Sequence, residues 1–116
     1  MTLVLPWPPS ANHYWKRNGA RYFIAPAGVQ FRVEVKARCA ALGVKPLAGQ
    51  VAMTVTLVPG DRRRRDIDNV LKPLLDALTH AGAWLDDSQV ARLVVERRVP
   101  NQADAGCVVT VEGWPP

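Results

Sequence analysis

Hydrophobic and polar positions alternate with two different periods along the chain, and these periods predict strands and helices. The run Thr2–Leu5 is short, apolar and followed by prolines, which is typical of a strand that stops early. Residues 51–58 alternate with period two and end at Pro59-Gly60, so they predict a second strand. Two further strands are expected at about 90–99 and 107–114, joined by a polar turn.

The clearest helical pattern covers residues 67–81. Apolar side chains recur there at spacings of three and four, at Ile67, Val70, Leu71, Leu74, Leu75 and Leu78. Gly82 supplies a helix stop. Pro73 lacks an N–H and clashes with the preceding turn, so the helix is expected either to start later than the apolar stripe or to bend in its first turns.

Residues 29–36 are ambiguous, because apolar and polar side chains alternate there as in a strand. However, Pro26 suits the first turn of a helix, and the following segment is rich in alanine and ends at Gly43. We therefore predict a helix over about 26–42. Between the first strand and this helix, residues 12–23 mix aromatic and basic side chains and predict a turn or short hairpin around Asn18-Gly19.

The resulting order, β-α-β-α-β-β, predicts an α+β fold in which two helices pack on one mixed sheet. A chain of 116 residues is expected to form one domain, 1–116, small enough to favour dimerisation. No apolar stretch approaches the roughly 20 residues that a bilayer requires, and the N-terminus lacks the basic region of a signal peptide, so a cytoplasmic location is expected. Cys39 and Cys107 fit no zinc or redox spacing and are expected to be reduced and structural.

The chain has an excess of basic residues, and several of them are clustered. Fifteen Lys and Arg against ten Asp and Glu give a net charge of +5, and four arginines stand together at 62–65. Clustered cations point to a polyanionic partner, although such a run can also be a solvated strip. Lys16 and Arg17, beside Tyr14 and Trp15, are the other candidate contacts with nucleic acid.

Carboxylates follow the arginines directly. Asp66 and Asp68 open the second helix, and Lys72 and Asp76 continue the polar face of Asp68 at spacings of four. If the strand after the helix returned past its N-terminal end, Asp87 could join the first two carboxylates and hold Mg²⁺. Lys72 would then stabilise the transition state of phosphodiester hydrolysis.

Simpler explanations exist for each of these residues. An aspartate at a helix start is usually a cap, and Asp68 with Lys72 could be an ordinary ion pair. Asp86 and Asp87 could cap a turn. His13 and His80 have no partner at ligand spacing and are expected in turns or at the surface.

The segment from Asp61 through the arginines to Asp66-Ile-Asp68-Asn69, followed by Lys72 and by Trp84-Leu-Asp-Asp87, closely resembles the RusA family of Holliday junction resolvases. The opening Leu5-Pro-Trp-Pro-Pro-Ser10 is also similar to that of the family. The resemblance extends over essentially the whole chain.

The resemblance implies a homodimeric endonuclease that nicks four-way DNA junctions symmetrically, uses Mg²⁺ (with Mn²⁺ as a substitute) and needs no small-molecule cofactor. Under it, Asp66, Asp68 and Asp87 match the metal ligands and Lys72 the catalytic lysine. Secondary candidates are Asp86 and Asn69. The candidate DNA contacts rest on charge rather than on the resemblance, and they are Arg62, Arg63, Arg64, Arg65, Lys16 and Arg17. Two alternatives remain open: a non-catalytic protein that binds branched DNA, and a nuclease that prefers flaps or forks.

Overall fold

The computed structural model describes all 116 residues. Its elements, in chain order, are β1 (Thr2–Leu5), α1 (Ala11–Tyr14), β2 (Trp15–Asn18), β3 (Arg21–Ile24), α2 (Pro26–Ala41), β4 (Val51–Val58), α3 (Asp68–His80), the 3₁₀ turn η1 (Asp87–Gln89), β5 (Val90–Arg97) and β6 (Gly106–Gly113). The predicted α+β class with a mixed sheet is confirmed.

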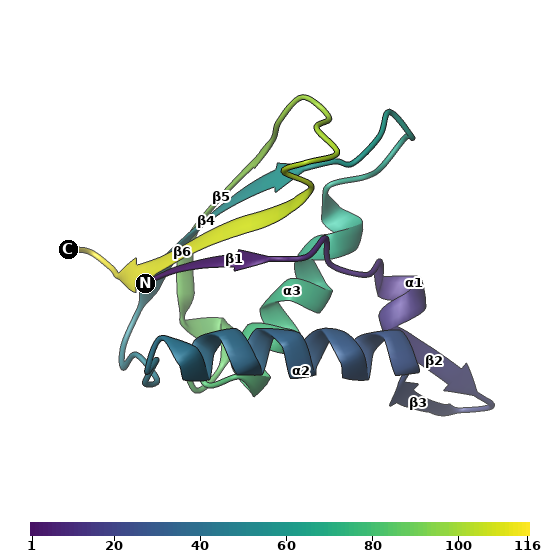
Figure 1. Ribbon diagram of the computed structural model, residues 1–116. Helices are drawn as coiled ribbons and strands as arrows, with labels where there is room; N and C mark the ends of the chain where they lie inside the picture. The colour runs from purple at the N-terminus through teal and green to yellow at the C-terminus, as the bar shows by residue number, and fades with distance from the viewer.

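Four strands form the main sheet in the order β1-β6-β4-β5 (Figure 1). The last strand, β6, lies between β1 and β4 and is antiparallel to both. In contrast, β5 is parallel to β4, with Val55 opposite Val95, because the connection between them passes through α3. This leaves β5 at one edge of the sheet, with no strand on its outer side.

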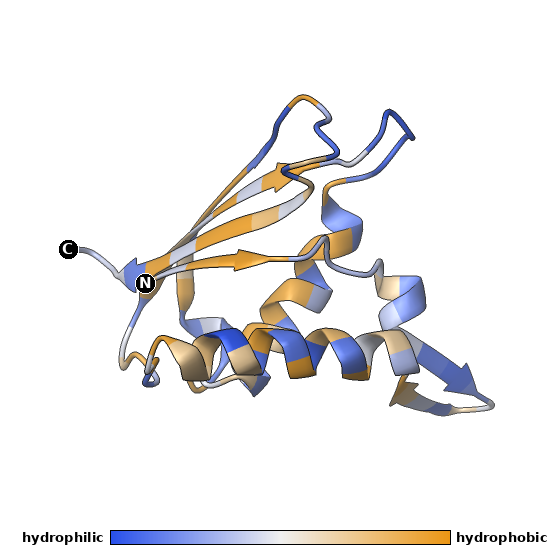
Figure 2. Cartoon of the chain, viewed as in Figure 1, coloured by the Kyte–Doolittle hydropathy of each residue, from blue (hydrophilic) through white to orange (hydrophobic).

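Helices α2 and α3 lie against one face of the sheet (Figure 1), and the core fills the space between the two layers. In Figure 2 the apolar side of α3 is turned toward the apolar strands. The largest fully buried side chains are Trp84, Tyr14, Leu3, Met53, Leu57, Leu74, Leu78, Val35, Val51, Val55, Val109 and Val111. Val4, which points to the opposite face of the sheet, is 63% exposed, so no second layer covers that face at β1.

The ambiguous segment is helical, as predicted. Phe31, Val35 and Cys39, spaced by four, are buried, whereas Val29 and Val33 are 46% and 62% exposed. Half of the alternating valine pattern therefore lies on the solvent side of α2, which explains how a strand-like sequence fits a helix.

Helix α3 runs from Asp68 to His80 without interruption and contains Pro73. The helix was predicted either to start later than the apolar stripe or to bend in its first turns. It is uninterrupted and starts at Asp68, one residue after Ile67, where the stripe begins. Pro73 is buried in the core-facing stripe. Because it has no N–H, the carbonyl of Asn69, one turn earlier, has no donor at the i+4 position.

The hairpin predicted around Asn18-Gly19 is present, as a separate two-stranded sheet of β2 and β3. Its turn places Gly19 at φ +64°, a conformation that glycine adopts without strain. The short helix α1, which precedes the hairpin, and η1 were not predicted from the sequence. None of the helices in the structure is both long and apolar enough to cross a membrane.

Candidate functional site

The arginine-rich loop between β4 and α3 is organised by Asp61. Its carboxylate accepts a hydrogen bond from the backbone N–H of Arg63 (2.9 Å) and pairs with the guanidinium groups of Arg63 (3.1 Å) and Arg65 (2.8 Å). These contacts, the backbone hydrogen bond first, lower the pKa of Asp61 to about 2. The loop therefore keeps this carboxylate charged at any pH at which a nuclease works.

Arg65 is a structural member of this loop. Besides Asp61, its guanidinium donates to the carbonyl of Arg63 (3.0 Å) and lies 5.3 Å from the ring centre of Trp7. Arg97, at the end of β5, donates to the carbonyl of Arg65 (2.7 Å). These contacts tie the start of α3 to the N-terminal segment and to the edge strand.

Arg62 and Arg64 differ from their neighbours. Both are exposed, and neither side chain makes a hydrogen bond or ion pair in the structure. The four arginines that were predicted to bind DNA therefore fall into two groups. Arg63 and Arg65 bind Asp61, whereas Arg62 and Arg64 extend freely into solvent.

Asp66 and Asp68 are exposed at the N-terminal end of α3. No side-chain hydrogen bond caps this helix, whose N-cap position is Ile67, and neither aspartate takes part in an ion pair. The explanation of Asp68 as a helix cap is thus not supported. The helix dipole favours a negative charge here, but each carboxylate retains its full capacity to accept hydrogen bonds or bind a cation.

Lys72 lies one turn along α3 and does not pair with Asp68. Its ammonium group is 6.0 Å from the ring centre of Trp15, at the base of the β2–β3 hairpin. Asp76, the next residue on this face, is paired instead with Arg32 of α2 at 2.6 Å. Lys72 is therefore a cation without a carboxylate partner.

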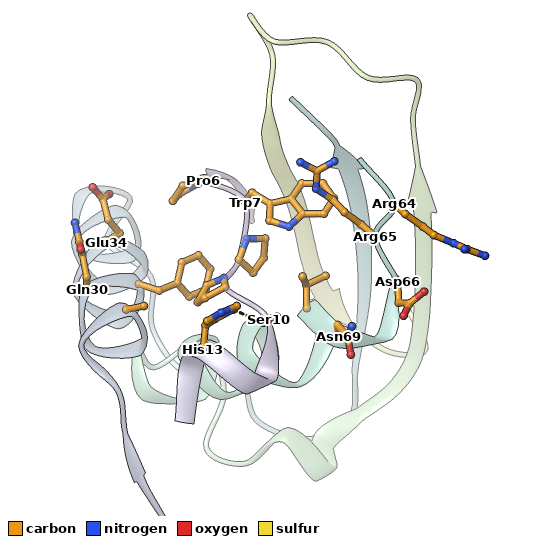
Figure 3. A pocket seen from close by; sticks show the side chains of 15 residues that line it. Pro6, Trp7, Ser10, His13, Gln30, Glu34, Arg64, Arg65, Asp66 and Asn69 are labelled. Carbon is orange, nitrogen blue, oxygen red and sulfur yellow. Dashed lines mark hydrogen bonds between the residues drawn. The ribbon is translucent and has the colours of Figure 1, made fainter. Parts of the chain in front are cut away.

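A groove of about 1000 Å³ opens beside Asp66. Figure 3 shows Asp66 and Asn69 on one of its walls, Gln30 and Glu34 of α2 on the opposite wall, and Trp7 between them. Arg64 and Arg65 also line it. The groove therefore combines the guanidinium groups of two arginines with the carboxylates of Glu34 and Asp66.

The Asp86-Asp87 turn is held rigidly by Gln89. Its side-chain oxygen accepts from the backbone N–H groups of Leu85 (2.9 Å) and Asp86 (3.0 Å), and its amide nitrogen donates to the carbonyls of Leu47 and Gly49, both at 2.8 Å. The role of Gln89 was not predicted, although a glutamine three residues after an aspartate is the pattern of a capping box.

Asp86 is the cap of this turn. It accepts from the hydroxyl (2.9 Å) and the backbone N–H (3.5 Å) of Ser88, and these hydrogen bonds lower its pKa. The capping explanation therefore holds for Asp86. Asp87, the first residue of η1, is exposed.

The structure separates Asp87 from Asp66 and Asp68 within one chain. Helix α3 has 13 residues and is therefore about 20 Å long. Asp87 follows its C-terminal end, whereas Asp66 and Asp68 lie at its start (Figure 1). Strand β5 runs back toward the start of α3, since Arg97 at its end binds the Arg65 carbonyl. Asp87, however, precedes the first residue of β5 and therefore lies at the far end of that strand. No three His, Cys, Asp or Glu side chains of the chain lie close enough together to hold a metal ion.

A partly buried polar contact joins α1, α2 and α3. The hydroxyl of Tyr14, whose side chain is fully buried, donates to the Asp76 carboxylate and accepts from Arg32 Nε at 2.9 Å. Burial, and next the hydrogen bond to Asp76, raise the pKa of Tyr14. The sequence pattern gave no signal for this contact, because its members lie 18 and 44 residues apart.

The remaining candidates follow the simpler expectations. Cys39 and Cys107 are free and buried, and burial raises the pKa of both thiols, to about 12 for Cys107. His13 shares a hydrogen bond with Ser10 (2.7 Å) in the turn before α1, and His80 is exposed at the end of α3.

The chain is similar to known proteins over most of its length. Residues 6–112 match the family model described as "Endodeoxyribonuclease RusA". The crossover junction endodeoxyribonuclease of Enterobacteria phage HK97 is 43% identical over 98 residues, which cover 83% of this chain and 81% of the phage protein. The crossover junction endodeoxyribonucleases of Shigella sonnei and of Escherichia coli K12 are 44% and 43% identical over 91 residues, covering 77% of this chain and 75% of each relative.

Proposed function

The chain belongs to the RusA family of endodeoxyribonucleases, and from this premise we propose that it resolves four-way DNA junctions by symmetric, Mg²⁺-dependent hydrolysis of phosphodiesters. One observation carries the proposal: Asp66 and Asp68 are unpaired carboxylates placed directly after a loop that presents free arginines. In a protein of net charge +5, such carboxylates would repel DNA unless a cation lay between them and the phosphate.

The donor set fits Mg²⁺, with Mn²⁺ as a substitute. This ion prefers a few carboxylate oxygens together with water and substrate phosphate, and Asp66 and Asp68 are exposed enough to leave room for both. When bound, it supplies a Lewis acid that polarises the scissile phosphate and lowers the pKa of a water molecule. Asn69, whose carbonyl lacks a helical donor because of Pro73, is a secondary contributor.

The remaining roles follow from charge and position. Arg62 and Arg64 bind backbone phosphates, since their guanidinium groups have no partner in the protein. Lys72 stabilises the charge that develops on the phosphate, since its ammonium group faces no carboxylate. Lys16 and Arg17 extend the positive surface onto the β2–β3 hairpin.

We propose that the protein acts as a homodimer joined along β5. This strand is a free edge, and two of its apolar side chains, Leu93 and Val94, are 39% and 38% exposed. Unpaired edges of this kind readily accept a second strand. A two-fold axis makes the added strand antiparallel, so each protomer would meet the same surface of its partner.

A β5-to-β5 dimer would also bring the three aspartates together. Antiparallel pairing sets the start of one β5 beside the end of the other. The partner's Asp87, just before the start of its β5, would then approach Arg97, whose guanidinium binds Arg65 next to Asp66. Each metal site would draw Asp66 and Asp68 from one protomer and Asp87 from the other.

The first experiment compares a labelled four-way junction with a matched linear duplex, in Mg²⁺ and in EDTA. We expect paired, symmetric nicks in the junction alone, abolished by EDTA. Tight junction binding without cleavage, on several junction sequences, would favour the non-catalytic alternative. Faster cleavage of flaps or forks than of four-way junctions would favour the other alternative.

Subunit mixing tests the shared site. Asp68→Asn and Asp87→Asn should each lower cleavage by more than about 100-fold, beyond the loss typical of an outer-shell partner. Co-refolded together, the two variants should regain activity and nick one strand, because the mixed dimer contains one site with all three carboxylates. If each site lay within one protomer, the mixture would stay inactive, and the β5 arrangement would be wrong.

The location follows from the substrate. The relatives come from enterobacteria and their phages, whose DNA lies in the cytoplasm, and we propose that this protein acts there.

A further inference from the structure

The β2–β3 hairpin concentrates basic and aromatic side chains and contains no carboxylate. It projects from the body of the molecule beside α1 (Figure 1). The first acidic residue of the chain is Glu34, so the whole N-terminal third before it carries only positive charge. Its side chains include Trp15, Lys16, Arg17, Arg21, Tyr22 and Phe23.

Two aromatic side chains that follow one another in β3 are open to solvent, one on each face of the hairpin. Tyr22 is 70% exposed and Phe23 is 47% exposed, so a flat ring is available to a ligand on each face. Arg17, opposite Tyr22 in the hairpin, lies over its ring at 5.6 Å and donates to the Gly19 carbonyl at 2.7 Å. The arginine therefore holds the exposed ring in place from one side and leaves its other surface free.

The hairpin also leads to the proposed active site. A groove of about 740 Å³ runs from Tyr22 and Phe23 past Trp15 to Lys72. Trp15 is half-buried and packs edge-on against Tyr14, with ring centres 4.4 Å apart, so it forms a fixed floor. A DNA strand in this groove would contact the cations and aromatic rings of the hairpin together with the proposed catalytic lysine.

We propose that this hairpin recognises the branch point of the junction, with Tyr22 on one face and Phe23 on the other each stacking on a base that the crossover leaves unstacked. A linear duplex presents phosphates but keeps its bases stacked inside the helix. At a branch point the stack is interrupted, and an aromatic side chain can cover the open face of a base. The arginines and lysine bind either substrate, whereas the rings distinguish between them. This inference rests on the proposed function.

The test compares binding of a four-way junction and of a matched duplex in EDTA, for the wild type and for Tyr22→Ala with Phe23→Ala. Loss of base stacking should weaken junction binding by about 5- to 100-fold, while duplex binding changes by less than about twofold. The dependence on salt should be unchanged, because no cation is removed. The exchange Tyr22→Phe with Phe23→Tyr keeps both rings and should bind as the wild type does.

Leu42→Ala serves as the matched control. Leu42 is also an exposed apolar residue (58%), but it lies at the opposite end of α2 from the hairpin. Tyr22→Ala alone removes only the more exposed ring and keeps the test available should the double variant unfold. Equal losses on junction and duplex, or no loss on either, would overturn the branch-point role. If the wild type itself showed no preference for the junction, the proposed function would fall, and this inference with it.

Discussion

At the scale of single residues, identical side chains in one run have different roles. Arg65 is only 23% exposed and binds Asp61 and Trp7, whereas Arg64, the preceding residue, has no partner. Counting arginines would have assigned both to DNA. The structure instead indicates that one fixes the loop and the other is available to a phosphate.

Substituting each arginine separates the two roles. Arg64→Ala should weaken DNA binding, reduce the slope of log K against log salt by about 1, and leave the free energy of unfolding within about 0.5 kcal/mol of the wild type. Arg65→Ala should lower that free energy by about 1–2 kcal/mol, since it removes a charge-assisted pair and a cation–π contact. Salt titrations and urea denaturation measure the two effects. Equal stability of the two variants would contradict this division.

At the scale of elements, the position of the hairpin depends on the contact of Tyr14 with Arg32 and Asp76. The carbonyl of Tyr14 also accepts from Ala25 N–H at 2.8 Å, which joins the end of α1 to the start of α2. Gly28 permits this approach, because a Cβ atom there would lie 2.5 Å from the Tyr14 carbonyl oxygen. The two helices and α3 therefore hold the base of the hairpin from three sides.

Tyr14→Phe should lower the free energy of unfolding by about 1–2 kcal/mol, since it leaves a partly buried carboxylate and guanidinium without one hydrogen-bonding partner. The measurement is urea denaturation. Tyr22→Phe, the same chemical change at an exposed ring, should cost less than about 0.5 kcal/mol. A smaller loss for Tyr14→Phe than for Tyr22→Phe would show that the buried hydroxyl does not anchor α1.

The long elements could be predicted from sequence because each buries one periodic face. The strand 51–58 was predicted with its observed bounds, and α2 and α3 within one residue at each end. The four-residue α1 could not be predicted, since its only buried residue, Tyr14, is fixed by partners distant in sequence. The candidate aspartates were found by their order along the chain. The distance between Asp87 and the other two aspartates was not predicted, because residue spacing alone does not show at which end of α3 the following turn lies.

At the scale of the whole molecule, the free edge of β5 decides the proposed assembly. A small domain with one sheet face uncovered gains from burying further apolar surface, and β5 offers both apolar side chains and unpaired backbone groups. The opposite edge, β1, has only four residues and is bound by the Arg38 side chain at the Val4 carbonyl.

Val94→Lys should prevent dimerisation and cleavage together while the protein stays folded. A lysine in the centre of an edge strand is a common protection against strand addition, and we expect the dimer dissociation constant to rise by at least about tenfold. Val4→Lys makes the same change at the other edge of the sheet and should leave the dimer intact. Sedimentation velocity measures both. A dimeric, active Val94→Lys protein would exclude β5 as the interface.

The position of β6 between β1 and β4 also governs the order in which the protein can form during synthesis. Thr2 pairs with Thr110, and the N-terminal ammonium group donates to the Val111 carbonyl at 3.1 Å. On the ribosome, β1 must therefore wait without a strand partner until about a hundred further residues have been added. Contacts this distant in sequence slow folding, so the sheet closes last. Until then β1, and the edge of β4 that β6 will occupy, stay unpaired and open to neighbouring nascent chains.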